Sequence, residues 1–136
     1  MKILVLGIDD AYFAPMLRGF LNYYLPKECK LFSGTKDHKP TDIAIELMDD
    51  VGIDISERLS KPAGKKSLPD FNLIITTTVA TKDYLSGFEL SKNIDVRNLD
   101  YELDESLTGK SFKKHLKKAR KQLQKFGEQL LEESIC

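Results

Sequence analysis

The segment that decides the fold is Lys2-Ile-Leu-Val-Leu-Gly-Ile-Asp-Asp-Ala-Tyr-Phe-Ala-Pro-Met16. A continuous apolar run, Ile3–Leu6, is followed by a break at Gly7 and then by the start of an apolar helical pattern. Such a run is typical of a strand that is buried on both faces of a sheet. The segment therefore predicts a strand, a tight loop and a helix, the arrangement in which α/β folds hold a phosphate-binding loop.

This loop has the wrong charge for a phosphate. It contains two adjacent carboxylates and no basic residue, and an acidic pair repels an anion. The candidate binding residues in it are Gly7, Ile8, Asp9, Asp10, Ala11, Tyr12 and Phe13. The segment thus excludes the usual phosphate chemistry more firmly than it indicates another function.

Strand and helix patterns alternate along the rest of the chain. Short apolar runs predict further strands at residues 30–32, 72–77 and 94–99. Helical spacing predicts helices at 13–24, 42–51, 79–85 and 111–133, with Thr41 as an N-cap and Gly52 as a stop. Residues 60–69 and the acidic stretch 100–110 are expected to be loops. Alternating strands and helices indicate parallel βαβ units in a single α/β domain, residues 1–136.

Composition narrows the function classes. The 136 residues include 21 basic and 21 acidic side chains, so net charge indicates neither nucleic acid nor a membrane as partner. The apolar runs are too short to span a bilayer, and the N-terminal run does not resemble a signal peptide. Cys29 and Cys136 do not form a disulfide framework, which favours a reducing, cytoplasmic setting.

Several strings resemble the low-molecular-weight protein tyrosine phosphatases, which share their fold with thioredoxin-coupled arsenate reductases. The matching strings are Lys2-Ile-Leu-Val-Leu6, Ala14-Pro15-Met16, Ser33-Gly34-Thr35, Ala44-Ile-Glu-Leu-Met48, Val51-Gly-Ile-Asp-Ile-Ser56 and Phe71-Asn-Leu-Ile-Ile75. The resemblance spans nearly the whole chain and is most specific between Ser33 and Ser56. It implies a three-layer α/β fold, with a four-stranded parallel sheet in the order 2-1-3-4 and helices on both faces.

The resemblance also implies which residues should act, and two of them are missing. The family carries a cysteine, five residues and an arginine after the first strand; the thiolate attacks phosphorus, while backbone N–H groups and the arginine hold the oxygens. Aligned on Pro15-Met16, the cysteine falls at Gly7 and the arginine at Phe13. We therefore expect no phosphatase activity by the family mechanism.

Other family positions are also altered. The family's aspartate general acid follows the last strand, where Asp100 and Asp104 are the candidates without the usual Asp-Pro context. The arsenate reductases carry further cysteines near the third strand, where this chain has Thr76-Thr-Thr-Val79. A general acid without a nucleophile has nothing to protonate.

The sequence thus favours an inactive, phosphatase-like binding or regulatory module with no cofactor. Its partner would be an unidentified protein, or a small ligand held in the remodelled loop beneath residues 100–104. One alternative is a Mg²⁺-dependent phosphotransfer or phosphatase enzyme that uses Asp9 and Asp10 as metal ligands. Another is a relative of the sugar-phosphotransferase B components, which also depend on a loop cysteine.

Three features carry a structural interpretation beside the functional one. Asp9 and Asp10 can cap the first helix, where negative charge is favourable, instead of holding a metal. Tyr12 and Phe13 can form an aromatic patch for a partner, or Phe13 can fill the space of the missing arginine. The basic half of the last helix can bind an acidic partner or, less expectedly, nucleic acid, or it can be a solvated face. Its basic residues are Lys110, Lys113, Lys114, Lys117, Lys118, Arg120, Lys121 and Lys125.

Overall fold

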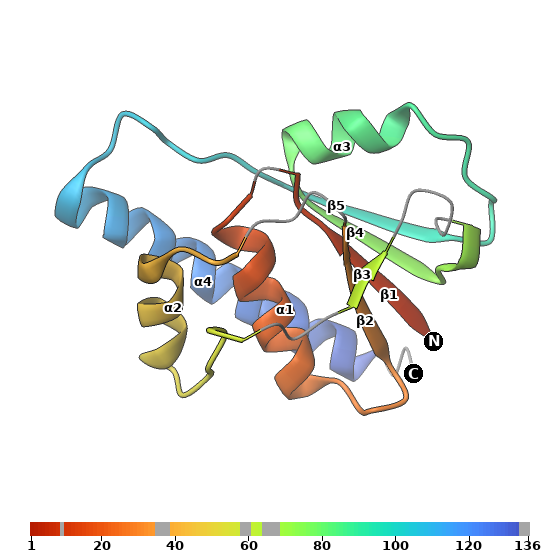
Figure 1. The fold of residues 1–136 in the computed structure, drawn as a ribbon, viewed down its shortest axis with the longest axis horizontal. Coiled ribbons are helices and arrows are strands. Elements are labelled where there is room, and N and C mark those ends of the chain that lie inside the picture. The colour runs from red at the N-terminus through yellow and green to blue at the C-terminus, as the bar shows by residue number, and fades with distance from the viewer. Residues whose placement is uncertain (9, 35–38, 58–60, 64–68, 134–136) are drawn as a thin grey trace.

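The sheet lies at the centre of the molecule. The computed structural model describes residues 1–8, 10–34, 39–57, 61–63 and 69–133, and the side chains of 61–63 are not described. All strands pair in parallel, in the order β3-β2-β1-β4-β5 (Figure 1). The strands are β1 (Lys2–Leu6), β2 (Lys30–Gly34), β3 (Lys61–Ala63), β4 (Leu73–Thr78) and β5 (Asp95–Tyr101).

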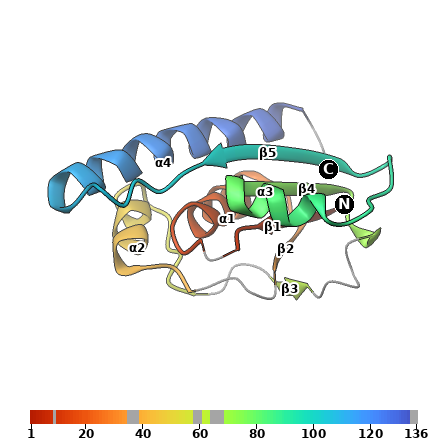
Figure 2. The same ribbon diagram turned by 90° about the horizontal axis from the view of Figure 1, so that it is seen from above.

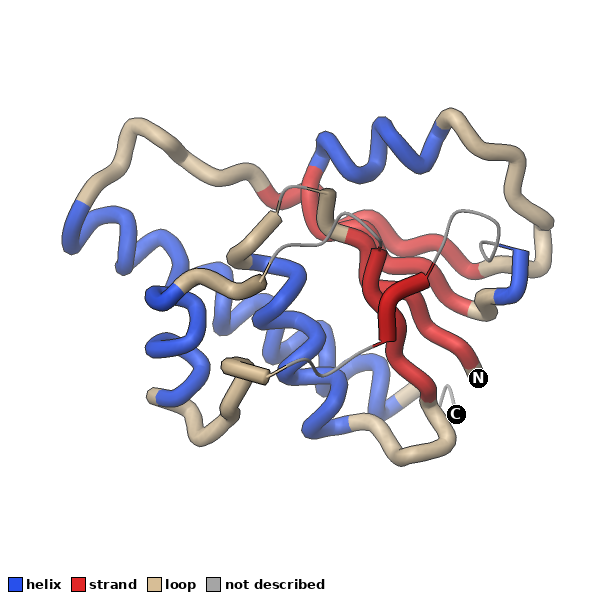
Figure 3. The backbone as a smooth tube through the Cα atoms, in the orientation of Figure 1, coloured by secondary structure: helices blue, strands red, loops and turns tan. Residues whose placement is uncertain are grey.

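Helices cover both faces of this sheet. Three of them lie against one face and α3 lies against the other, which gives the predicted three layers (Figure 3). Seen from above, α3 lies in front of the strands (Figure 2). The helices are α1 (Phe13–Tyr24), α2 (Asp42–Asp49), α3 (Val79–Ser86) and α4 (Gly109–Glu132). The predicted N-cap of α2 is confirmed, since the Thr41 side chain accepts from the Ala44 N–H at 3.3 Å. The helix ends before Gly52, which has a φ of 80° and follows the C-cap Asp50.

The alternating side chains of β1 explain its continuous apolar run. Ile3 and Val5 join the core under α1, α2 and α4, whereas Leu4 and Leu6 join the core under α3. All four are buried, so β1 needs an apolar residue at every position.

The strand order confirms the prediction and extends it. The four predicted strands are β2, β1, β4 and β5 in that spatial order, which is the predicted 2-1-3-4. The fifth strand, β3, falls in the segment expected to be a loop and pairs with the far edge of β2. Three residues that include Pro62 carry too little pattern to be predicted as a strand.

The topology fixes where a site belongs. The chain leaves β1 between two neighbours, β2 and β4, that are reached by connections running in opposite directions across the sheet. Ligands of open α/β sheets bind at such a switch point, beyond the carboxyl ends of the strands. Residues 7–13 follow β1 at this point. Within the described residues, no helix combines the length and apolar character needed to cross a membrane.

Candidate functional site

Asp10 is the centre of the loop that follows β1. Its Oδ1 accepts hydrogen bonds from the backbone N–H groups of Tyr12 (2.9 Å) and Phe13 (2.8 Å), and its Oδ2 accepts from the N–H of Ala14 (2.8 Å). These are donors that the first turn of α1 cannot satisfy within the helix. The side chain is only 5% exposed. The capping interpretation is therefore confirmed for Asp10, while Asp9 lies outside the described residues.

One threonine at the end of β4 and one at the start of α3 complete this arrangement. The Thr77 hydroxyl donates to Asp10 Oδ2 at 2.6 Å, and the Ile8 N–H donates to the Thr81 hydroxyl at 2.9 Å. Both threonines are fully buried. From the sequence, Thr77 was notable only as part of a threonine run without cysteines. The usable signal was its place at the carboxyl end of a central strand, beside the end of β1.

Gly7 leaves no room for a larger residue. A Cβ atom added at this position would lie 2.5 Å from Ala14 Cβ, 3.0 Å from Thr77 Oγ1 and 3.1 Å from Asp10 Oδ2. Real Cβ atoms essentially never approach another heavy atom as closely as the first of these distances. The loop is thus closed around a residue without a side chain.

Aromatic rings occupy the neighbouring space. Phe13 is 1% exposed and stacks on Tyr101 of β5, with ring centroids 5.1 Å apart and planes 17° from parallel. Tyr12 is half-buried and meets Phe112 of α4 edge-on at 5.6 Å. Phe13 therefore belongs to the core and is not an exposed patch, and burial raises the pKa of the Tyr101 phenol.

The structure does not join the two predicted acid candidates to the loop. Asp100, whose φ of 55° is left-handed, forms an ion pair with Lys82 of α3 at 3.6 Å. Asp104 is exposed and accepts from the backbone N–H and hydroxyl of Ser106, and these bonds lower the pKa of Asp104. Neither carboxylate bonds to a described residue of 7–13. A lowered pKa also makes Asp104 a poorer proton donor near neutral pH.

Thiol chemistry is likewise absent from the described residues. Cys29, which precedes β2 at the opposite end of the sheet, is disulfide-bonded, so the described part of the chain holds no free cysteine. This differs from the reduced state that the sequence favours. Cys136 lies outside the described residues.

Comparison with solved structures identifies the fold. The structure matches a mutant of YwlE from Bacillus subtilis at 18% identity and a TM-score of 0.74, over 98% of this chain and 97% of the other. It matches a low-molecular-weight protein tyrosine phosphatase from T. tengcongensis at 19% identity and a TM-score of 0.73, over 98% and 99%. An oxidised arsenate reductase matches at 19% identity and a TM-score of 0.70, over 97% of both chains.

The chain has the fold of the low-molecular-weight protein tyrosine phosphatases. No family model and no curated protein sequence matches it. Residues 7–13 follow β1, and the resemblance predicts a phosphate-binding loop after the first strand. In this chain a carboxylate of the loop itself accepts the N–H donors there, as shown by the hydrogen bonds of Asp10.

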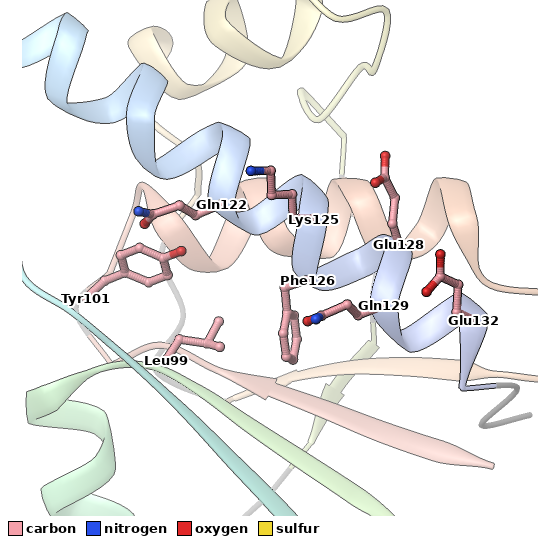
Figure 4. Close-up of a pocket in the computed structure, with 8 residues that line it drawn as sticks. All are labelled: Leu99, Tyr101, Gln122, Lys125, Phe126, Glu128, Gln129 and Glu132. Carbon is pink, nitrogen blue, oxygen red and sulfur yellow. The ribbon is translucent and has the colours of Figure 1, made fainter.

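A groove opens on the other side of Tyr101, between β5 and α4. Its volume is about 520 Å³, within the range of small-molecule sites. Leu99, Tyr101 and Phe126 give it an apolar floor, and Figure 4 shows the Tyr101 hydroxyl directed toward α4. Its rim is polar and comes from α4, with Gln122, Lys125, Glu128, Gln129 and Glu132. The sequence alone did not predict this groove, because its two sides come from β5 and α4, and the sequence does not show how these elements pack.

The Asp10 carboxylate is fully hydrogen-bonded within the protein. Both oxygens of Asp10 already accept protein hydrogen bonds, so a cation there would have to displace buried donors. Among the described residues, no group of three or more His, Cys, Asp or Glu side chains is arranged to hold a metal ion.

Proposed function

We propose that this chain is a catalytically inactive, phosphatase-like protein that acts as a binding or regulatory module. The observation that carries the proposal is the bonding of the Asp10 carboxylate. It accepts three backbone N–H groups and the Thr77 hydroxyl, and so it takes the place of an external anion. N–H donors that already bond to a carboxylate cannot stabilise the negative charge of a phosphoryl transition state.

The neighbouring residues support the same conclusion. Gly7 offers no nucleophile at the position of the family's cysteine, and the surrounding atoms leave no space for one. Phe13 has no donor for a phosphate oxygen and is packed against Tyr101. Loss of the nucleophile alone lowers kcat of a covalent mechanism by several orders of magnitude.

The Mg²⁺-dependent alternative is weaker because Asp10 is already saturated with protein donors. No observation favours a sugar-phosphotransferase B component, which needs the same missing cysteine. The predicted cytoplasmic location stays part of the proposal, although a disulfide at Cys29 counts against a reducing compartment. Thiol alkylation before cell lysis would measure the redox state of Cys29.

The groove between β5 and α4 is the proposed place for a small ligand. An apolar floor beside carboxylates and amides suits an amphipathic molecule that carries a cationic or donor group. The sequence favoured a ligand site within residues 7–13. We place the proposed site on the other side of Tyr101, because Tyr101 packs directly on Phe13 and covers that part of the loop.

The first test is hydrolysis of a generic aryl phosphate from about pH 5 to 8, with Mg²⁺ and then with EDTA. A catalytically intact phosphatase of the same fold serves as the positive control. We expect no turnover above buffer in either condition. Turnover only with Mg²⁺ would make the acidic loop a metal site, and turnover insensitive to EDTA would overturn the proposal.

A further inference from the structure

The net charge of the chain is zero, but its basic and acidic residues are unevenly distributed along the sequence. Residues 110–125, in the first two thirds of α4, hold eight of the chain's 21 basic residues and none of its 21 acidic residues. The rest of the chain therefore has 13 basic and 21 acidic residues, a formal charge of −8. Such a concentration of cations on one helix calls for a physical explanation.

Two of these cations hold α4 against α2. Lys113 Nζ lies 2.7 Å from Glu46 Oε1. Arg120 Nη1 donates to the Leu47 carbonyl at 2.8 Å and lies 4.0 Å from Asp50 Oδ2. These two side chains have a structural role.

The other six cations form no such hydrogen bond or ion pair with a described residue. All six are exposed. Their spacing of three or four residues puts them on one face of α4, opposite the buried stripe that includes Leu116, Leu123 and Leu130. We call this the lysine face: Lys110, Lys114, Lys117, Lys118, Lys121 and Lys125.

The lysine face works against the stability of its own helix. Like charges three or four residues apart repel each other, as in Lys114–Lys118 and Lys117–Lys121. Cations near a helix N-terminus also oppose the macrodipole. A face that served only solubility could alternate charges, as helices commonly do.

A groove follows this face. Its volume is about 600 Å³, and four of the six lysines line it. Leu107, Ser111, His115 and Arg120 complete the lining, so the groove offers an apolar contact beside the ammonium groups. From Lys110 to Lys125 the lysine face extends about 22 Å along α4.

Both ends of the lysine face are closed by acidic residues. Glu102 and Glu105 are exposed before it, and Glu128 and Glu132 are exposed after it. A long polyanion such as nucleic acid would run onto these carboxylates. The groove lining also has no Phe, Tyr or Trp side chain for base stacking, and its one guanidinium is engaged with α2. A short acidic segment avoids both problems.

We propose that the lysine face is the docking site for a short acidic segment of a partner protein, about four helical turns long. This site is separate from residues 7–13 and does not depend on whether the loop is inactive. Opposite charge would steer the encounter and make it sensitive to salt.

The test uses a fluorescent peptide of about 16 residues, with glutamates every three or four positions and leucines between them. Binding is measured by anisotropy from about 50 mM to about 0.3 M salt. The variant is Lys114→Gln, Lys118→Gln and Lys121→Gln combined. Its matched control is Lys27→Gln, Lys39→Gln and Lys92→Gln, which removes the same charge from exposed sites elsewhere.

We expect salt-sensitive binding that weakens about tenfold in the lysine-face variant and little in the control. Equal losses in both variants, or no binding at low salt, would overturn the proposal. So would equally tight binding of a short RNA duplex, which makes the face a nucleic-acid site. Self-association that the lysine-face variant abolishes, seen by analytical ultracentrifugation, would identify a second copy as the occupant and also overturn it.

Discussion

At the scale of single residues, the Asp10 carboxylate accepts the backbone N–H groups at the start of α1. Replacing it in Asp10→Ala leaves the Phe13 and Ala14 N–H groups without their acceptor in a buried place. We expect a loss of about 2–4 kcal/mol in the free energy of unfolding, measured by urea denaturation. Because the freed N–H groups can donate to a bound anion, sulfate should then raise the Tm of the variant.

Wild-type protein is the control for that rescue. Its donors are occupied, so sulfate should raise its Tm only by the general salting-out effect. An equal shift in both proteins would show that Asp10 does not occupy the anion position.

Gly7 gives a second prediction at this scale. Gly7→Cys introduces the cysteine that the resemblance predicts at this position, but its Cβ would lie 2.5 Å from Ala14 Cβ. We expect about 1–3 kcal/mol of destabilisation from overpacking and no aryl phosphate hydrolysis. Gly7→Ala is the matched variant and should lose similar stability, because the Cβ and not the thiol causes the clash. Aryl phosphate hydrolysis by Gly7→Cys would contradict the conclusion that the loop has no room for a side chain at position 7.

Some of the site could be predicted from sequence, and the reason for the rest is physical. An aspartate just before a helix is a common cap, so the role of Asp10 followed from local position. Thr77 was missed because its bond to Asp10 spans 67 positions and depends on the register between β1 and β4. Asp100 and Asp104 were placed by analogy with the family, and analogy cannot give side-chain directions.

At the scale of elements, β5 is tied to α1 through the Tyr101–Phe13 stack. Burial raises the pKa of the Tyr101 phenol above its ordinary value of 10.0, so the folded state holds this proton more tightly than the unfolded state. Stability from this group is therefore complete below about pH 10 and falls as the pH rises through the folded pKa.

Tyr101→Phe should weaken this alkaline dependence, as measured by urea denaturation from about pH 8 to 11. Burial is also the main cause that raises the pKa of Tyr24, so Tyr24→Phe is the comparison and the double variant should have the flattest profile. An unchanged slope in Tyr101→Phe would show that the phenol is solvated and that the stack with Phe13 is loose.

Element prediction succeeded where periodicity was strong. The apolar run of β1 and the stripe of α4 each specify a burial pattern, and both elements were found within two or three residues of their ends. β3 was missed because three residues cannot show a period, and its pairing with β2 comes from the tertiary fold.

At the scale of the whole molecule, the strand order was predicted through the resemblance and not through physics alone. Parallel pairing and helices on both faces followed from the alternation of elements, but the place of β1 between β2 and β4 did not. The proposed loss of catalysis would in turn be a local change within a fold that extends over nearly the whole length of the matched structures.

The separated charge yields a prediction about the stability of the whole molecule. If the lysine face is retained for binding, repulsion among its lysines should lower the stability of the protein at low salt. The variant with Lys114, Lys118 and Lys121 changed to Gln should therefore have a higher Tm than wild type. Salt screens this repulsion, and the difference in Tm should shrink as salt is raised to about 1 M. Differential scanning calorimetry of both proteins across this range measures the effect.

The off-face variant at Lys27, Lys39 and Lys92 should show no such gain, because these lysines are far apart in sequence. If the lysine-face variant has a higher Tm and binds the acidic peptide more weakly, the lysine face is a binding surface, since such surfaces commonly trade stability for function. If the lysine face is only a solvated surface, the lysine-face variant should have a higher Tm but bind the acidic peptide no more weakly than wild type does. The paired measurement of Tm and peptide affinity therefore separates the two roles, which neither measurement does alone.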